Sequence, residues 1–122
     1  MKYLNPRPNT TDGKIEIIKG DNRPVNLNHK SDGVTSNLTQ TRVVLTIRDK
    51  KELDATPVKV LDSGDSPAFI TVGSTSPNII LNVDEVCELP EKLYYYDLKF
   101  IDSNDKEHHK IINTLEIVAR NR

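Results

Sequence analysis

The chain has 122 residues and a mass of 13.8 kDa, which is the size of a single domain. Its 17 basic and 18 acidic residues give a formal charge of −1, so no long-range field favours binding to a nucleic acid or to an anionic membrane. The apolar runs are far too short to span a bilayer and no apolar signal segment opens the chain, so we expect a soluble protein that is not secreted. Cys87 is the single cysteine, which excludes an internal disulfide and a zinc site built from several thiolates.

In the first half of the chain, apolar residues recur with a period of two, which is the spacing of half-buried β-strands. The clearest example places Val43, Leu45 and Ile47 on one face and polar side chains on the other. Turn-forming residues separate this run from its neighbours. The predicted strands of this half are residues 14–19, 25–28, 41–48 and 57–61.

The same period continues through the second half. A five-residue polar segment, 73–77, separates two apolar runs and predicts a hairpin. Residues 84–89 have room for one helical turn at most, because Pro90 follows them. A further turn at 103–105 predicts a second hairpin near the C-terminus. The predicted strands of this half are residues 69–72, 78–83, 93–100 and 106–118.

No window of about eleven residues carries a helical stripe, which argues against helical bundles and alternating α/β architectures. One-sided strands bury their apolar faces when two sheets pack face to face. What remains is an all-β sandwich or a small barrel, and this way of burying apolar faces favours the sandwich. We therefore predict an all-β protein, an antiparallel β-sandwich of about seven strands over residues 14–122. Residues 1–13 contain Pro6 and Pro8 and are predicted to be an extended N-terminal arm outside the core.

The histidines and the acidic turn do not form a recognisable metal site. His108 and His109 are adjacent, so on a strand they would point to opposite faces and could not easily share one ion. The segment 62–65 offers two carboxylates but lacks the further carboxylates and the spacing of a calcium loop, which favours a plain turn. We expect neither a metal nor another cofactor.

Nucleophilic catalysis finds no support either. The neighbours of Cys87 include Glu85 and Glu88, whose negative charges raise the pKa of a thiol and favour a buried, unreactive cysteine. No glycine-rich phosphate-loop pattern is present, and the many aspartates and glutamates give too many accidental pairs to indicate acid–base chemistry. We expect a protein that is not an enzyme and has no catalytic residue.

Three consecutive tyrosines suggest a stacking platform for a sugar or a base. On a strand, Tyr94 and Tyr96 point to one side, where we expect the core, and Tyr95 points to the other. A single exposed ring is a poor platform for stacking. Tyr95 is therefore a candidate contact to a partner. The alternative function is a carbohydrate-binding or host-adhesion module of the same fold, in which Tyr95 and loop asparagines and aspartates would contact a glycan.

Four segments of the chain carry a resemblance to a known family. Residues 15–21 look like an opening strand that ends in a Gly-Asp turn, and residues 37–48 are similar to a polar turn followed by a strand that ends in arginine. Residues 79–83 and 93–100 add two more strand patterns, the second of them rich in tyrosine. Together they resemble the immunoglobulin-like domains of structural proteins from tailed bacteriophages, notably the N-terminal domains of baseplate upper proteins. Many members carry a glycine where this chain has residues 113–115.

The resemblance implies an immunoglobulin-like sandwich that is a non-enzymatic part of a phage virion, in the tail, baseplate, collar or capsid decoration. Such a module is assembled in the host cytoplasm and docks, in many symmetric copies, to other virion proteins, with no nucleic acid or membrane as partner. We expect it to dock through exposed strand edges, loops and the N-terminal arm. The candidate contact residues are Tyr3, Leu4, Arg7 and Tyr95.

Overall fold

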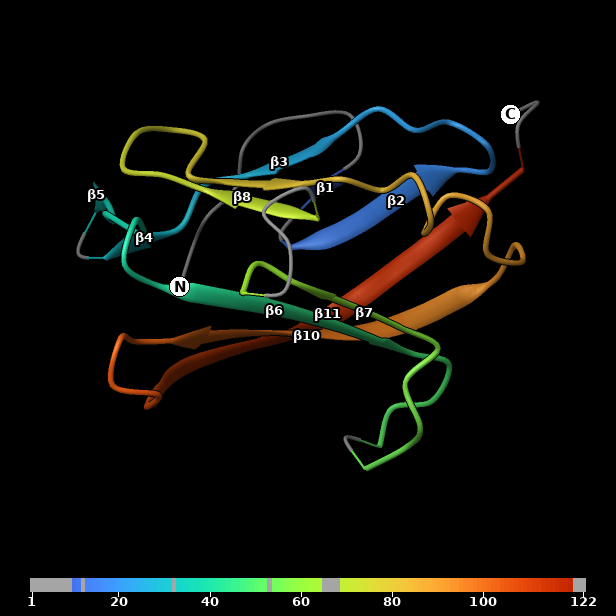
Figure 1. Cartoon of the computed structure of the whole chain (residues 1–122). Coiled ribbons are helices and arrows are strands. Elements are labelled where there is room, and N and C mark those ends of the chain that lie inside the picture. The colour runs from blue at the N-terminus through green and yellow to red at the C-terminus, as the bar shows by residue number, and fades with distance from the viewer. Residues whose placement is uncertain (1–9, 12, 32, 53, 65–68, 120–122) are drawn as a thin grey trace.

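The computed structural model describes residues 10–11, 13–31, 33–52, 54–64 and 69–119, and of residues 10, 11, 31 and 108–110 it describes the backbone alone. All regular elements in these ranges are β-strands, and nine of the eleven form two layers that pack face to face (Figure 1). No helix in the described ranges is long and apolar enough to cross a membrane. The predicted all-β class is confirmed, and the two layers give the fold the form of a β-sandwich.

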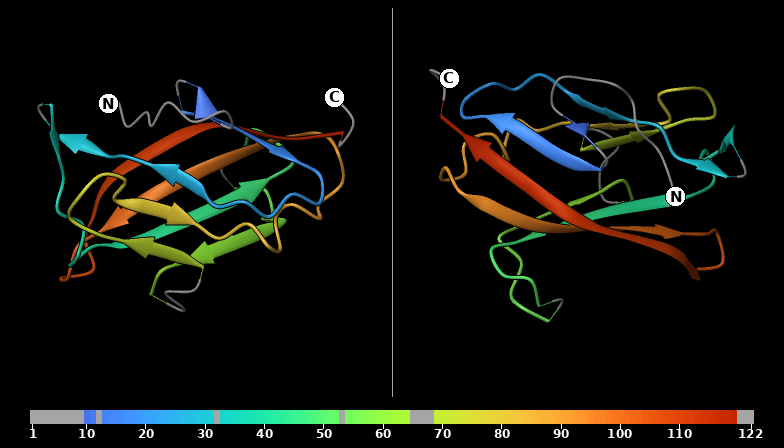
Figure 2. Two further views of the ribbon diagram at one scale, coloured as in Figure 1. Left: turned by 90° about the horizontal axis from the view of Figure 1, so that it is seen from above. Right: turned by 180° about the vertical axis from the view of Figure 1, so that it is seen from behind.

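The larger layer is a six-stranded sheet in the order β1-β2-β11-β10-β6-β7 (Figures 1 and 2). Its neighbouring strands are antiparallel except β2 and β11, which run parallel where residues 15–18 pair with residues 115–118. The prediction of a purely antiparallel sandwich fails at this pair, because its strands come from opposite ends of the chain and no tight hairpin sets their direction. The strands are β1 (Thr10–Thr11), β2 (Lys14–Ile18), β6 (Arg42–Arg48), β7 (Lys59–Asp62), β10 (Leu93–Ile101) and β11 (Glu107–Val118).

The smaller layer is a three-stranded antiparallel sheet in the order β3-β9-β8. Gly73 N donates to Asn78 O over 3.0 Å and closes the hairpin between β8 and β9, so the hairpin predicted around 73–77 is confirmed. A separate two-stranded ribbon pairs β4 with β5. These strands are β3 (Val25–Leu27), β4 (Lys30–Ser31), β5 (Val34–Thr35), β8 (Ile70–Val72) and β9 (Ile79–Leu81).

Alternation along the strands fills the space between the layers. Val43, Leu45 and Ile47 of β6 are at most 1% exposed, as the period-two pattern predicts. Tyr94 and Tyr96 lie on the same face of β10 and are both buried, so the predicted pair of core tyrosines is confirmed. Most other core residues are aliphatic: Ile15, Ile17, Val25, Leu27, Leu61, Ile70, Ile79, Leu81, Leu98, Leu115 and Ile117.

The connection from β9 to β10 passes from one layer to the other through a tight turn. Cys87 N donates to Val83 O over 2.8 Å, so the single helical turn expected at 84–89 is present as a hydrogen-bonded turn and not as a helix. Tyr94 Oη then donates to Pro90 O over 2.8 Å. This bond fixes the direction in which the chain enters β10.

The start of the described chain belongs to the sandwich. Residues 10–11 form β1, which pairs with β2 at the edge of the larger sheet. Tyr96 Oη also donates to Gly13 O, which ties this segment to the core. The sheet therefore begins within the range expected to be an arm. Outside the described residues lie three of the candidate contacts, Tyr3, Leu4 and Arg7.

Candidate functional site

The six-stranded sheet has one face on the core and one turned away from the smaller layer, which we call the outward face (Figure 2). Side chains alternate between the two faces along each strand. Because Tyr96 is buried in the core, its neighbours Tyr95 and Asp97 lie on the outward face of β10. Asp97 is paired with Thr46 of β6 and with Ile112 of β11, so these side chains lie on the outward face too.

Four large hydrophobic side chains on the outward face are exposed to solvent, and we call them the apolar patch: Val58, Val60, Leu93 and Ile112. Their exposed fractions run from 39% at Val58 to 55% at Ile112. Only one other large hydrophobic in the described ranges, Val34 of β5, is exposed to this degree. Val58 and Val60 lie at β7, and Leu93 and Ile112 lie at β10 and β11, so the patch has two apolar parts on either side of a polar centre. Several exposed hydrophobic residues on one face make that face a candidate surface for a partner.

The middle of the outward face is polar but buried. Arg48 Nη1 donates to Asp97 Oδ1, and Asp97 is only 1% exposed. Arg48 Nε also donates to Ala55 O over 3.0 Å. The other carboxylate oxygen, Asp97 Oδ2, is buried and has no hydrogen-bond partner among the described residues. Arg48 thus holds the loop between β6 and β7 to the sheet and gives the outward face an ordered centre.

Two charged side chains stand at opposite ends of the outward face. Lys99 lies two residues beyond Asp97 on β10, and Glu116 of β11 is paired with Leu93 at the other end. The levels of Leu93 and Lys99 are about 20 Å apart along β10, at about 3.4 Å per residue. Neither the Lys99 ammonium nor the Glu116 carboxylate forms an ion pair with another described residue. The face therefore carries an uncompensated charge of each sign at its two ends.

Tyr95 is the one candidate contact within the described residues. It is partly exposed on the outward face between Arg48 of β6 and Thr114 of β11, so the predicted orientation of the tyrosine run is confirmed. The apolar patch beside it is not among the residues predicted from the sequence. The sequence did contain an indication, because Ile112 directly follows the core residue Ile111. Successive residues of a strand point to opposite faces, so two consecutive isoleucines place an apolar side chain on each face, and only one of these faces packs on the core.

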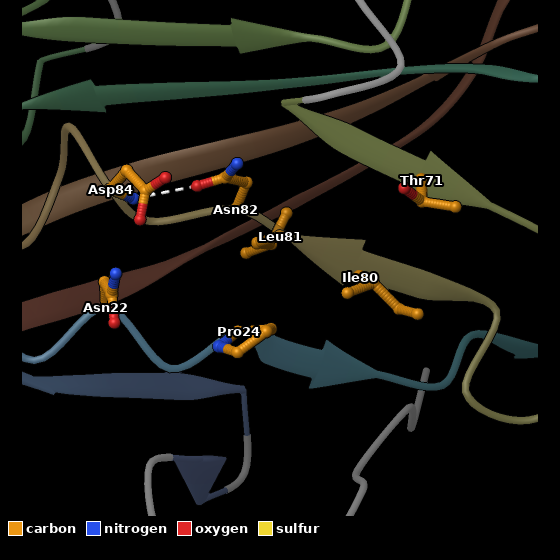
Figure 3. Close-up of a pocket in the computed structure, with 7 residues that line it drawn as sticks. All are labelled: Asn22, Pro24, Thr71, Ile80, Leu81, Asn82 and Asp84. Carbon is orange, nitrogen blue, oxygen red and sulfur yellow. Dashed lines mark hydrogen bonds between the residues drawn. The ribbon is translucent and has the colours of Figure 1, made fainter.

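A shallow groove of about 330 Å³ lies beside β8 and β9 (Figure 3). Asn22, Asn82 and Asp84 gather at one end of it, and Asp84 N donates to Asn82 Oδ1 over 2.9 Å. Ile80 and Thr71 line the other end. A second groove, of about 380 Å³, is lined by residues 39–42 at the entry to β6, by the turn after β7 at residues 63–64, and by β8. Neither lining contains an aromatic side chain, so neither groove offers a ring to stack against a sugar.

The turn after β7 is held by a buried carboxylate. Arg42 Nε and Gly64 N both donate to Asp62 Oδ1 over 2.8 Å. A Cβ atom on Gly64 would lie only 2.7 Å from Arg42 Nε, so this close approach requires glycine. The Asp62 carboxylate is thus engaged within the turn predicted at 62–65. In the described part of the chain, no group of three or more His, Cys, Asp or Glu side chains is placed to hold a metal ion.

His29 belongs to a cluster that joins two loops to the core. Its Nδ1 lies 2.8 Å from Ser36 Oγ, and its ring centre lies 4.6 Å from that of Phe100. Asn78 accepts from His29 N at 2.8 Å and donates to His29 O and Ser36 O at 2.9 and 2.8 Å. The ring is buried against the core, so the serine and histidine stabilise the loop conformation.

Cys87 is a buried thiol whose Sγ donates to Asp84 O over 3.6 Å. Burial is the main factor that raises its pKa, and the charges of Glu88 and Asp84 raise the pKa further. The predicted direction of the shift is confirmed. Glu85 pairs with Lys59 instead, and Asp84 takes the place that the sequence analysis gave to Glu85. A thiol in this setting is a poor nucleophile at neutral pH.

A scan of the chain against models of known protein families finds no match, and no curated protein matches it.

Proposed function

We propose that this chain is a non-enzymatic protein-docking module that serves as a structural component of a tailed-bacteriophage virion. The observation that carries the proposal is the apolar patch on the outward face, which leaves Val58, Val60, Leu93 and Ile112 in solvent. Burying exposed apolar surface is the main favourable contribution to protein association. The outward face has this surface, flanked by charges that can set the orientation of a partner.

We also propose that the sandwich is immunoglobulin-like. In support, the order β2-β11-β10-β6-β7 matches immunoglobulin strands A′, G, F, C and C′, and the order β3-β9-β8 matches B, E and D. The hydrogen bond from Tyr94 to Pro90 resembles the tyrosine corner found at the start of strand F. Tyr96 stands two residues later, where antibody domains have the second cysteine of their inter-sheet disulfide. A buried tyrosine at that position fits a chain that has one cysteine.

A place in a virion agrees with this kind of surface. Symmetric assemblies hold many copies of one module close together, so contacts that are weak one at a time become strong together. Tyr95 on the outward face and Tyr3, Leu4 and Arg7 of the N-terminal segment remain the proposed contact residues. The proposed partners are other virion proteins, and the tail, baseplate, collar and capsid surface are the proposed locations.

The test is a mass-spectrometric inventory of purified virions from a phage that carries the gene, together with capture of virion proteins on the immobilised chain. We expect the chain in the particles and at least one virion protein on the immobilised chain. Ile112→Glu should abolish capture, and the matched control Val34→Glu should not, because Val34 is 67% exposed on a different sheet. Absence from virions, with no virion protein captured, would overturn the proposal.

A further inference from the structure

We propose that the outward face binds a second copy of this chain, and that the two copies are related by a two-fold axis perpendicular to the strands of the sheet. The inference rests on the proposed docking function, because it uses the same face and names the partner. Two observations carry it: the positions of the uncompensated charges on Lys99 and Glu116, and the place of Val58, Val60 and Ile112 of the apolar patch between their levels.

The charges distinguish between the two ways in which the face can pack on itself. A closed dimer brings the same face of both copies together around a two-fold axis that lies in the plane of contact. An axis parallel to the strands brings like ends together, so Lys99 meets the lysine end of the second copy. An axis perpendicular to the strands reverses their direction and brings each Lys99 to the Glu116 end of the other copy. Attraction between opposite charges favours the second arrangement, and repulsion between like charges disfavours the first.

The apolar patch fits the same rotation. Counted along β10, Tyr96 lies midway between Lys99 and Leu93, which is paired with Glu116. Tyr96 is paired with Ile47 of β6, and Ile47 is paired with Lys59 of β7, so Lys59 lies at the same height along the strands. Val58 and Val60 flank Lys59, so an axis at this level places Val58 of one copy over Val60 of the other. One rotation therefore pairs the charges and buries the valines.

The remaining charges on and beside the face are compatible with this packing. Arg48 and Asp97 neutralise each other within the sheet. Glu16 and Lys14 carry opposite charges and both lie on β2, one strand further from the patch than β11. The charge that faces Lys99 of the second copy is therefore that of Glu116.

The size of the face indicates a weak dimer. The strands β7, β6, β10 and β11 span about 15 Å at a spacing of about 4.8 Å, and the two charged ends are about 20 Å apart. Such a face covers roughly 300 Å² of each copy in projection, or roughly 600 Å² in total, which is below the roughly 1,200 Å² of a standard specific interface. We expect a dissociation constant of about 100 μM, which becomes effective when copies are held close together.

The test measures the dissociation constant by sedimentation equilibrium, with the full chain from about 1 μM to 1 mM. We expect Lys99→Glu to weaken the dimer at least tenfold, because the new carboxylate faces Glu116, and Glu116→Lys to do the same, because the new ammonium faces Lys99. An equimolar mixture of the two variants should dimerise again, since both contacts in the mixed pair join a lysine to a glutamate. If like ends met, the mixture would also join a lysine to a glutamate at each contact, but neither single variant would weaken the dimer, because each would only replace one like-charge contact with another. Weakening in both single variants, together with rescue in the mixture, therefore identifies copies that exchange these ends.

A monomeric wild type at every concentration would overturn the inference, and so would a mixture that stays monomeric. Ile112→Glu should also weaken the dimer, whereas Val34→Glu should not. Circular dichroism and the melting temperature check that each variant is folded. If the chain is monomeric but Ile112→Glu abolishes capture of virion proteins, self-association is wrong and the docking function stands. If the chain dimerises as described but is absent from virions, the inference stands and the virion function is wrong.

Discussion

Arg48 and Asp97 form a buried ion pair on the side of the sheet that is turned away from the core. An aspartate at an outward-facing strand position is ordinarily hydrated, yet this carboxylate is 1% exposed and depends on one guanidinium for its compensation. Arg48 also reaches Ala55 O, so the pair joins two neighbouring strands and the loop between β6 and β7. A charge in such a position is costly when its partner is removed.

Asp97→Asn keeps the shape of the side chain and removes its charge. We expect the free energy of unfolding to fall by about 3 kcal/mol, because the Arg48 guanidinium stays buried without a counter-ion. Urea denaturation measures the loss. The control is Asp49→Asn, which breaks the exposed 3.9 Å pair with Lys92 and should cost less than about 1 kcal/mol. Equal losses in the two variants would contradict the prediction.

Tyr94→Phe removes the hydroxyl that donates to Pro90 O. We expect a loss of about 1 kcal/mol in the free energy of unfolding, because the carbonyl loses its partner at the entry to β10. Tyr95→Phe is the matched control on the next residue, and it should change stability by less than about 0.5 kcal/mol. Thermal and urea unfolding can be compared for both. A larger effect at Tyr95 would show that the outward ring, and not the corner, stabilises this strand.

Gly64→Ala places a methyl group 2.7 Å from Arg42 Nε and 3.2 Å from Asp62 Oδ1. The bidentate contact between those side chains must shift, so we expect a loss of about 1–2 kcal/mol in stability. At Gly73 a Cβ atom would meet no atom within 4 Å, so Gly73→Ala should be neutral within about 0.5 kcal/mol. The prediction fails if the two alanine variants unfold at the same urea concentration.

The Cys87 thiol should react with iodoacetamide much more slowly in the folded chain than in urea at pH 8, because burial raises its pKa and leaves little thiolate. The same shift affects stability. Below about pH 8.5 the thiol is protonated in both states; above that pH it ionises first in the unfolded chain, so the free energy of unfolding falls as the pH rises. Cys87→Ala should remove this component of the pH dependence. Fast alkylation of the folded chain at pH 8 would contradict the assignment of a buried thiol.

The local pattern predicts the strands well, because each alternating run carries its own evidence of an apolar face. The run around Val43 and the three tyrosines both have the predicted orientation. The pattern does not predict which strands become neighbours. The parallel pairing of residues 15–18 with residues 115–118 depends on a contact between segments a hundred positions apart, and no local period encodes it.

The two valines of the apolar patch were not predictable for a related reason. In the run from Val58 to Leu61, two valines share one face, so alternation alone favours them as the buried residues. In the structure Leu61 enters the core, and Val58 and Val60 face solvent, because the register with β6 sets the face. The burial of Asp97 likewise depends on Arg48, which is 49 positions away and meets it only in the folded sheet.

The parallel pair of β2 and β11 determines how the sandwich responds to mechanical force. The chain enters β2 at Lys14 and leaves β11 at Val118, at opposite ends of the pair. Tension on the two ends, after the two residue pairs of β1 have opened, pulls these strands past each other along their length. The hydrogen bonds between residues 15–18 and 115–118, with the bond from Lys19 N to Val118 O at 2.9 Å, are then loaded together in shear instead of opening one by one. The sandwich therefore resists stretching most strongly along the line that joins its two ends.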